Sequence, residues 1–198
     1  MNFILIGYRA SGKTSVGKKL SGLLGLPLYD TDALIRQQTG KTVREMVLHG
    51  GWPAFREAER AAVDSLAGQE ETVIALGGGA VLDPANVKVL KPRGFFIWLQ
   101  ADKESIQERL KGDWSSAEQR PPLSISGKGD EEEILRRRIP IYEAIADLIV
   151  DTTGLRIEAV AEEIFAALRN RKSSGPGSPS LEESAGEGIG EARCREIH

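Results

Sequence analysis

The strongest constraint on the fold lies near the start of the chain, where residues 3–6 form a short apolar run that leads into Gly7-Tyr8-Arg9-Ala10-Ser11-Gly12-Lys13-Thr14. This loop matches the pattern G-x-x-x-x-G-K-[ST], and the residues after it repeat with the period of an amphipathic helix. A strand, a glycine-rich loop and a helix in this order aim backbone N–H groups and the positive end of the helix at one point. The segment therefore predicts a phosphate-binding loop in an α/β domain.

The polar residues of this loop suit a nucleotide. Lys13 is placed to neutralise the β- and γ-phosphates, and the hydroxyl of Thr14 is a suitable ligand for Mg²⁺. The alternative is a glycine-rich turn with an exposed lysine, which the strand before the loop and the helix after it disfavour. We therefore expect ATP or GTP with Mg²⁺, bound by Gly7, Ala10, Ser11, Gly12, Lys13, Thr14 and Ser15.

Composition excludes several other classes of protein. The 26 Lys and Arg residues against 29 Asp and Glu residues give a net charge of −3, so no field of one sign attracts nucleic acid or an acidic membrane. The single cysteine, Cys194, excludes an intrachain disulfide, and two histidines are too few for a histidine cluster. The start of the chain lacks the features of a signal peptide, and no apolar run approaches the roughly 18 residues of a membrane span, so we expect a cytoplasmic protein.

The composition changes near residue 173. Residues 1–172 alternate short apolar runs with amphipathic stretches, which predicts one α/β domain with a mostly parallel sheet. Residues 173–198 are rich in Gly, Ser and Glu and are predicted to be a disordered tail. Strands are predicted at residues 3–6, 72–76, 94–99 and 148–150. Two stripes of apolar residues at helical spacing are predicted to be core. The first stripe is Val16, Leu20, Leu23 and Leu24, and the second is Ile157, Val160, Ala161, Ile164, Phe165 and Leu168.

A long polar connection interrupts the domain. Residues 111–130 contain three glycines and two prolines and show no hydrophobic period. Connections of this length inside a compact domain usually carry function. We therefore expect a mobile lid at about residues 112–128.

Two carboxylates follow Leu26-Pro27-Leu28-Tyr29, the segment after the first predicted helix. Asp30 and Asp32 are two residues apart, so in extended backbone both side chains lie on one face and reach the same cleft. One acid is then available to support Mg²⁺ through water while the other accepts a hydrogen bond from an acceptor hydroxyl. The alternative is that one of them only caps the helix that begins near Ala33.

Three further motifs contain residues that suit a small anionic ligand. Arg56 and Glu59 are neighbours on one helix face, as a binding pair or as an exposed ion pair. Gly77-Gly78-Gly79 ends a strand, either as a mobile turn or as a site of close backbone approach. Arg136-Arg137-Arg138 supplies three guanidinium groups, of which we expect about one to bind a carboxylate or phosphate while the others face solvent.

Together these motifs resemble those of the shikimate kinase family. The phosphate loop, Asp30-x-Asp32, Phe55-Arg56-x-x-Glu59, Gly77-Gly78-Gly79, Arg120-Pro121 and Arg138-x-x-x-Tyr142 follow the order of the family at similar spacing. The resemblance implies a three-layer P-loop kinase fold, in which helices flank a five-stranded parallel sheet of order 2-3-1-4-5. The implied reaction transfers the γ-phosphate of ATP to the 3-hydroxyl of shikimate, giving shikimate 3-phosphate and ADP, a step of aromatic amino acid biosynthesis through chorismate.

The resemblance also implies catalytic and metal-binding roles. Asp32 would hold the acceptor hydroxyl and act as the base, and Lys13 would act beside it on the phosphates. Asp30 would support Mg²⁺ together with Thr14. Arg120, in the lid, would fold over the phosphates of ATP and stabilise the transition state.

Five more residues receive roles from the same resemblance. Arg56 and Arg138 match the positions that bind the carboxylate of shikimate, and Glu59 matches the residue that orients Arg56. Gly78 and Gly79 match the positions whose backbone contacts the ring and its hydroxyl groups. These are therefore the residues that we expect around the acceptor.

The chain departs from the family pattern in three places. A second proline, Pro122, lengthens the Arg-Pro-Leu motif of the lid. The residues that sandwich adenine are not evident, and we expect Lys111 or Trp114 on one face and residues 153–155, Thr-Gly-Leu, on the other. Tyr8-Arg9 replaces the commoner Phe/Leu-Met, and we assign no role to this change.

Other functions fit part of the pattern. Two arginines, an aspartate and a glycine turn suit any polyhydroxylated acid, so residue chemistry alone leaves a gluconate kinase or another small-molecule kinase open. A nucleotide-binding module without turnover is the alternative outside enzymes. The ordered motifs favour shikimate, and we expect a monomer that binds only shikimate, ATP and Mg²⁺, without nucleic acid or membrane partners.

Overall fold

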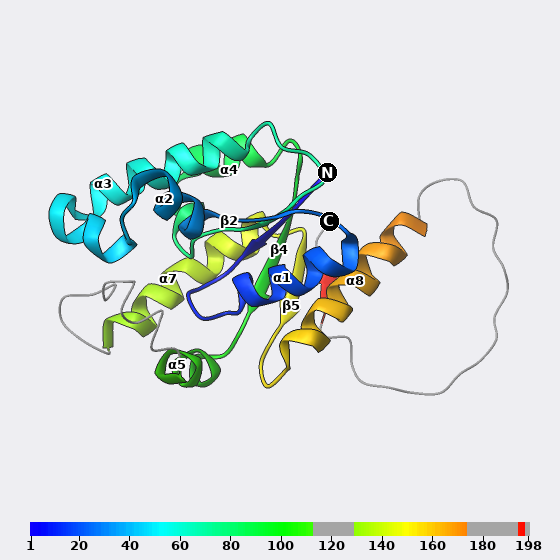
Figure 1. The fold of residues 1–198 in the computed structure, drawn as a ribbon. Coiled ribbons are helices and arrows are strands. Elements are labelled where there is room, and N and C mark those ends of the chain that lie inside the picture. The colour runs from blue at the N-terminus through cyan, green and yellow to red at the C-terminus, as the bar shows by residue number, and fades with distance from the viewer. Residues whose placement is uncertain (113–128, 174–193, 197–198) are drawn as a thin grey trace, which may run out of the picture.

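The structure, a computed structural model, describes residues 1–112, 129–173 and 194–196 (Figure 1). Within these residues one sheet contains six strands in the order β2-β3-β1-β4-β5-β6. The strands are β1 (Asn2–Ile6), β2 (Leu28–Asp30), β3 (Val73–Ala75), β4 (Gly94–Gln100), β5 (Leu148–Asp151) and β6 (Cys194–Glu196). The first five are parallel, with Ile4 of β1 opposite Ile74 of β3 and Phe96 of β4. The predicted order 2-3-1-4-5 is confirmed.

Helices cover both faces of the sheet, as the alternation of apolar and amphipathic segments predicts. On one face, α1 and α8 pack on Leu5 and Ile97, and on the other, α3, α4 and α7 pack on Ile4 and Phe96. Successive residues of β1 therefore enter different cores. The helices are α1 (Lys13–Leu24), α2 (Thr31–Thr39), α3 (Val43–Leu66), α4 (Pro84–Leu90), α5 (Lys103–Gly112), α7 (Gly129–Ile145) and α8 (Ile157–Ser173), and a 3-10 turn, η1, spans Ala80–Leu82.

The two predicted helical stripes occupy α1 and α8. Most of their members are buried in the core or packed against it. Ile157 is the exception, because it is the first residue of α8 and its side chain is 41% exposed. The prediction that Ile157 is core is therefore wrong, and this residue instead lines a cavity described below.

Helix α3 consists of two segments joined by a kink. Gly51 has a φ of 70°, which falls in the left-handed region, and Pro53 follows it. The kink turns Trp52 toward Phe55, with their ring centroids 5.9 Å apart. Sequence reasoning placed Arg56 and Glu59 on a helix, and they lie on the second segment of α3.

The sixth strand departs from the predicted topology. Residues 194–196 fall in the predicted disordered tail, yet they pair antiparallel with β5, with Cys194 opposite Val150. The predicted sheet of five parallel strands is therefore extended by one antiparallel strand at its edge. Ser173, predicted to begin the tail, is instead the last residue of α8 (Ile157–Ser173). The rest of the tail and the predicted lid, including Arg120, lie outside the described residues, apart from residue 112, which ends α5.

A search of the described residues for a helix both long and apolar enough to cross a membrane finds none.

Candidate active site

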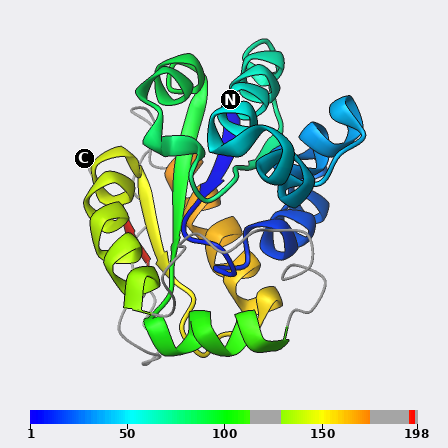
Figure 2. The same ribbon diagram turned by 90° about the vertical axis from the view of Figure 1, so that its left-hand side faces the viewer.

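The predicted site residues gather at the carboxyl ends of the parallel strands. The phosphate loop follows β1, Asp30 ends β2 with Asp32 two residues later, and Gly77-Gly78-Gly79 follows β3. Ligands of open α/β sheets bind at this edge. Figure 2 shows α5 across the same end of the sheet, beyond β4. Two pockets lie here, one on each side of the phosphate loop.

The phosphate loop adopts a backbone that its glycines permit. Gly7 has a φ of 141° and Gly12 a φ of 95°, and a Cβ atom on Gly7 would lie only 2.6 Å from the carbonyl oxygen of Leu99. Ala10 also has a positive φ, of 60°. Lys13 is buried, and its ammonium donates hydrogen bonds to the carbonyl oxygens of Gly7 at 3.0 Å and Tyr8 at 2.7 Å. The lysine is thus held within the loop that is predicted to bind phosphates.

The two carboxylate oxygens of Asp30 accept hydrogen bonds from different parts of the chain. Its Oδ1 accepts hydrogen bonds from the backbone N–H groups of Asp32 and Ala33, at 3.0 and 3.1 Å, and so caps α2. Its Oδ2 accepts a hydrogen bond of 2.6 Å from the hydroxyl of Thr14. The capping alternative therefore describes Asp30 correctly, and the same carboxylate also reaches the residue expected to bind Mg²⁺. The cap leaves Asp32, two residues on, to line a pocket of its own.

We call this pocket the acceptor pocket. It is lined by Arg9, Asp32, Val43, Trp52, Phe55, Arg56, Glu59, Gly77, Gly78, Gly79 and Arg138. Four separate segments of the chain thus bring together the aspartate, two arginines and glycines that the sequence singled out. Arg9 is the one charged lining residue to which sequence reasoning gave no role.

Arg56 is fixed from two sides. It forms an ion pair with Glu59, and its guanidinium lies 5.6 Å from the ring centroid of Trp52 and 5.3 Å from that of Phe55. Glu59 is 1% exposed, so the pair is not the surface ion pair that the sequence left open. Burial raises the pKa of the Glu59 carboxyl, and the positive charge of Arg56 opposes this rise.

The surroundings of the glycine turn leave no room for side chains. A Cβ atom on Gly79 would lie 2.5 Å from Nη2 of Arg56, and one on Gly77 would lie 2.8 Å from Oε1 of Glu59. The backbone N–H of Gly77 donates a hydrogen bond of 2.8 Å to the hydroxyl of Thr31. The turn is therefore held in place by its contacts, which argues against the alternative of a mobile turn.

Of the three consecutive arginines, Arg138 turns inward. Arg136 and Arg137 are 76% exposed and both pair with Glu133 at the surface of α7. Arg138 is only 9% exposed, donates a hydrogen bond of 3.2 Å to the carbonyl oxygen of Gly78, and lies 5.5 Å from the ring centroid of Tyr8. The division between one buried and two exposed side chains follows the expectation from the sequence.

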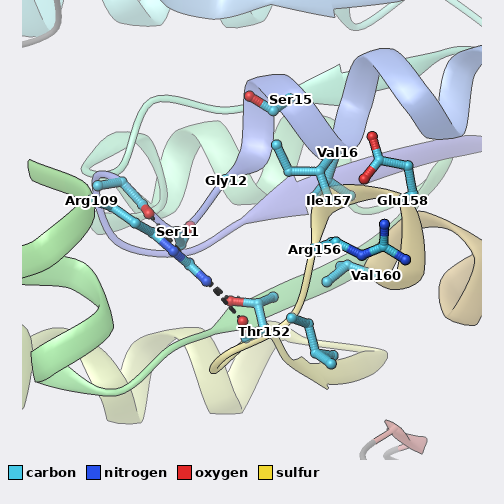
Figure 3. Close-up of a pocket in the computed structure, with 12 residues that line it drawn as sticks. Ser11, Gly12, Ser15, Val16, Arg109, Thr152, Arg156, Ile157, Glu158 and Val160 are labelled. Atoms are coloured by element: carbon cyan, nitrogen blue, oxygen red, sulfur yellow. Dashed lines mark hydrogen bonds between the residues drawn. The ribbon is translucent and has the colours of Figure 1, made fainter. Parts of the chain in front are cut away.

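The second pocket is a cavity of about 610 Å³ between the phosphate loop and the start of α8 (Figure 3). We call it the nucleoside cavity. Arg109 of α5 reaches across it, and its guanidinium donates hydrogen bonds to the hydroxyl and carbonyl oxygens of Thr152, at 3.2 and 2.8 Å. The cavity is lined by Ala10, Ser11, Gly12, Ser15, Val16, Arg109, Thr152, Leu155, Arg156, Ile157, Glu158 and Val160.

Sequence reasoning did not assign Arg109 to this cavity. Of the two residues expected on one face of adenine, Lys111 is exposed on α5, two residues after Arg109, and Trp114 lies outside the described residues. Of residues 153–155, Leu155 lines the cavity, whereas the hydroxyl of Thr153 accepts a hydrogen bond of 3.2 Å from the N–H of Asp102. The sequence feature that could have indicated Arg109 is its position in the last turn of the helix before the predicted lid.

Comparison with known proteins gives a consistent result. The family model described as shikimate kinase matches residues 9–169. A shikimate kinase from Syntrophus aciditrophicus is 45% identical over 182 residues, which cover 86% of this chain and 92% of that protein. One from Moorella thermoacetica is 42% identical over 168 residues, covering 85% and 94%. The solved shikimate kinase from Acinetobacter baumannii, in complex with shikimate, superposes with a TM-score of 0.79 at 28% identity, covering 86% of this chain and 94% of that one.

Proposed function

Because this chain belongs to the shikimate kinase family, we propose that its two pockets hold the two substrates, ATP in the nucleoside cavity and shikimate in the acceptor pocket. The protein is a kinase that uses ATP to phosphorylate shikimate in aromatic biosynthesis. The observation that carries the proposed arrangement is that consecutive loop residues, Arg9 and Ala10, line different pockets. The phosphate loop is thus the wall that both substrates share, where the γ-phosphate has to pass from one to the other.

On the ATP side, we assign the phosphates to the loop and the first turn of α1. The ligands are Gly7, Ala10, Ser11, Gly12, Lys13, Thr14 and Ser15, with Arg120 of the lid as a further expected contact. The planar guanidinium of Arg109, held by Thr152, offers a face on which adenine stacks. Leu155, which also lines the cavity, supplies an apolar contact.

Thr14 and Asp30 fit a magnesium ion. A hydroxyl and a carboxylate 2.6 Å apart, next to a phosphate loop, provide the few oxygen ligands that Mg²⁺ takes from protein when phosphates and water complete its shell. When bound, the ion neutralises charge on the phosphates of ATP. Thr14 would bind it directly, and Asp30, whose other oxygen is occupied by the cap of α2, would hold its water shell.

On the acceptor side, Arg56 and Arg138 bind the carboxylate of shikimate, while the backbone of Gly78 and Gly79 contacts the ring and its hydroxyl groups. The support is their common pocket and the fixed position of each guanidinium. Bidentate pairing of arginine with carboxylate gives orientation as well as affinity. The 3-hydroxyl is then directed toward Asp32.

The chemical step follows from this placement. Asp32 accepts the hydrogen bond of the 3-hydroxyl and takes its proton as the oxygen attacks the γ-phosphorus of ATP. The new O–P bond forms as the bond from phosphorus to the β-phosphate oxygen breaks, and ADP leaves. Lys13, held by the loop, stabilises the charge that spreads over the phosphoryl oxygens, so positioning and electrostatics account for most of the catalysis.

We also propose that the protein is a cytoplasmic monomer with a mobile lid at about residues 112–128, and that residues 173–193 do not contribute to the site. Nucleic acid and membranes are not among its proposed partners, in line with its net charge of −3.

The experiment is a coupled assay of ADP release with Mg²⁺-ATP and a panel of hydroxy acids. Shikimate is expected to stimulate ADP release, while gluconate and a no-acceptor control give only background hydrolysis. Stimulation by gluconate with none by shikimate would contradict the proposed acceptor. Nucleotide binding without stimulation by any acid would indicate a binding module.

A further inference from the structure

Arg9 belongs to the phosphate loop by sequence but lines the acceptor pocket in space. It is the third residue of the loop, and it lines the same pocket as Asp32, Arg56 and Arg138. The next residue, Ala10, lines the nucleoside cavity instead. Arg9 therefore stands at the boundary between the two substrates, on the acceptor side.

The backbone around Arg9 is held in one conformation. Tyr8 before it is buried and its carbonyl oxygen accepts a hydrogen bond from Lys13, while Ala10 after it has a φ of 60°. The glycine turn packs directly on this point, since a Cβ atom on Gly78 would lie 3.1 Å from the backbone nitrogen of Arg9. The side chain of Arg9 thus leaves the loop at a fixed position beside the turn.

The charges of the acceptor pocket show what Arg9 adds. Among the described residues, three arginines, Arg9, Arg56 and Arg138, line it together with two acids, Asp32 and Glu59. Glu59 already pairs with Arg56, and Arg9 adds a third guanidinium to the residues that line the pocket. The acceptor is an anion, and its product carries an additional phosphate, so a further positive charge at this pocket favours both.

The charges of Arg9 and Arg138 act on the same aromatic residue. Arg138 lies 5.5 Å from the ring centroid of Tyr8, and the charges of Arg9 and Arg138 both oppose the rise that burial causes in the pKa of the Tyr8 phenol. Both positive charges therefore lie near Tyr8, and Arg138 also contacts the glycine turn. This arrangement gives the Tyr8-Arg9 pair, to which sequence reasoning assigned no role, a place in the site.

We propose that Arg9 is a specificity-determining residue, whose positive charge at the acceptor pocket retains a carboxylate-bearing acceptor and its phosphorylated product. The inference rests on the proposed position of shikimate in the acceptor pocket. It assigns to Arg9, on the phosphate loop, a contribution separate from that of Arg56 and Arg138.

The test compares Arg9→Met, which keeps an unbranched apolar stem but removes the charge, with Arg9→Lys, which keeps the charge. Arg36→Met, on the exposed part of α2, removes one positive charge outside the pocket and serves as the control. Steady-state ADP release gives the KM for shikimate at saturating Mg²⁺-ATP, and calorimetric titration gives the dissociation constants of shikimate and of ADP.

We expect Arg9→Met to raise the KM and dissociation constant of shikimate about tenfold, the scale of one interaction with a charged group, and Arg9→Lys to restore most of the loss. Inhibition by shikimate 3-phosphate should weaken at least as much, and the salt dependence of the shikimate KM should be smaller in Arg9→Met than in wild type. ADP binding should be unchanged in both variants, and Arg36→Met should resemble wild type.

Three results would overturn the proposal. These are an unchanged shikimate affinity in Arg9→Met, a loss that Arg9→Lys does not relieve, and an equal loss of ADP affinity, which would mean that Arg9 only maintains the loop. A wild-type protein that binds ADP but neither binds nor phosphorylates shikimate would instead contradict the proposed function itself.

Discussion

The phenolic oxygen of Tyr142 donates a hydrogen bond of 2.6 Å to the carbonyl oxygen of Gly78, which joins α7 to the glycine turn. Arg138, one turn earlier on α7, donates to the same oxygen at 3.2 Å. Tyr142 is buried beside Trp98, with ring centroids 5.8 Å apart. The orientation of the peptide between Gly78 and Gly79, whose backbone we propose to contact the acceptor, therefore depends on a buried residue of α7.

Tyr142→Phe should raise the shikimate KM several-fold and leave the ATP KM unchanged, because it removes one hydrogen bond worth about 0.5–1.5 kcal/mol without changing the packing. Burial raises the pKa of Tyr142 to about 12, so the phenol keeps its proton between about pH 6 and 9. The increase in the shikimate KM should therefore be the same across this pH range. Tyr29→Phe, on β2 against the same core, is the matched control. Equal effects of both variants on both substrates would mean that Tyr142 only packs.

Arg138→Ala should raise the shikimate KM by more than tenfold, because breaking a desolvated charge interaction costs about 2–5 kcal/mol and every 1.4 kcal/mol is tenfold. Arg136→Ala removes the same side chain from the exposed face of α7, where its ion pair with Glu133 is screened by water. Its kinetics should match those of wild type. If Arg138→Ala changed only the ATP KM, the assignment of the acceptor carboxylate to Arg138 would be wrong.

Arg109→Met should raise the ATP KM about tenfold and leave the shikimate KM unchanged, because the planar cation that we place against adenine would be lost. Arg109→Lys separates charge from shape. Lysine keeps the charge but offers no flat face and lacks the two separate nitrogens with which Arg109 reaches the two oxygens of Thr152, so it should resemble Arg109→Met. Full activity of the lysine variant would show that charge alone matters at this position.

The burial of Glu59 predicts a pH dependence of stability. Because the pKa of Glu59 is higher in the folded than in the unfolded protein, the folded state holds more protons between these two values. The contribution of Glu59 is then fully present below its unfolded pKa of about 4.3 and decreases as the pH rises through the folded pKa.

Urea denaturation of wild type and Glu59→Gln at several pH values measures this contribution. The stability of wild type relative to the variant should be greatest at the acidic end of the accessible range and should decline as the pH rises above the usual glutamate range. Parallel stability curves would show that Glu59 titrates as an ordinary carboxyl. Glu59→Gln should also raise the shikimate KM, because Arg56 loses its ion pair.

The parts of the molecule that sequence reasoning predicted are those fixed by local chemistry. The phosphate loop needs glycine where φ is positive, and Arg138 differs from Arg136 because helical spacing turns one arginine inward. Arg109 was missed because an arginine in the last turn of a helix is usually a solvated residue that favours the helix dipole. Its role becomes visible only when the chain brings Thr152 within hydrogen-bond distance.

Strand β6 was missed for a different reason. Composition averages over the Gly-, Ser- and Glu-rich tail, whereas three residues near its end suffice to pair with an edge strand. Ile149 lies opposite Arg195, and Cys194 packs against the core formed by α1 and α8. Contacts between residues this far apart in sequence leave no local pattern.

The pairing of β6 with β5 predicts a measurable contribution to stability. β5 leads directly into Thr152, which holds Arg109, so covering its edge should stabilise the wall of the nucleoside cavity. Replacing Cys194, Arg195 and Glu196 by Gly, Ser and Gly keeps the chain length and introduces two glycines, which disfavour a strand. If the pairing contributes about 1 kcal/mol, the Tm should fall by about 2–4 °C for a domain of this size.

Hydrogen exchange locates this effect. The amides of β5 should exchange faster in the Gly-Ser-Gly variant, while those of β2, at the opposite edge of the sheet, should be unaffected. A variant lacking residues 174–198 should show the same changes, because the strand is then removed completely. At 25 °C both variants should retain the kcat and shikimate KM of wild type. The glycine turn and Asp32 of the acceptor pocket follow β3 and β2, which lie toward the edge of the sheet opposite β6. Unchanged Tm and exchange in both variants would mean that β6 does not stabilise β5.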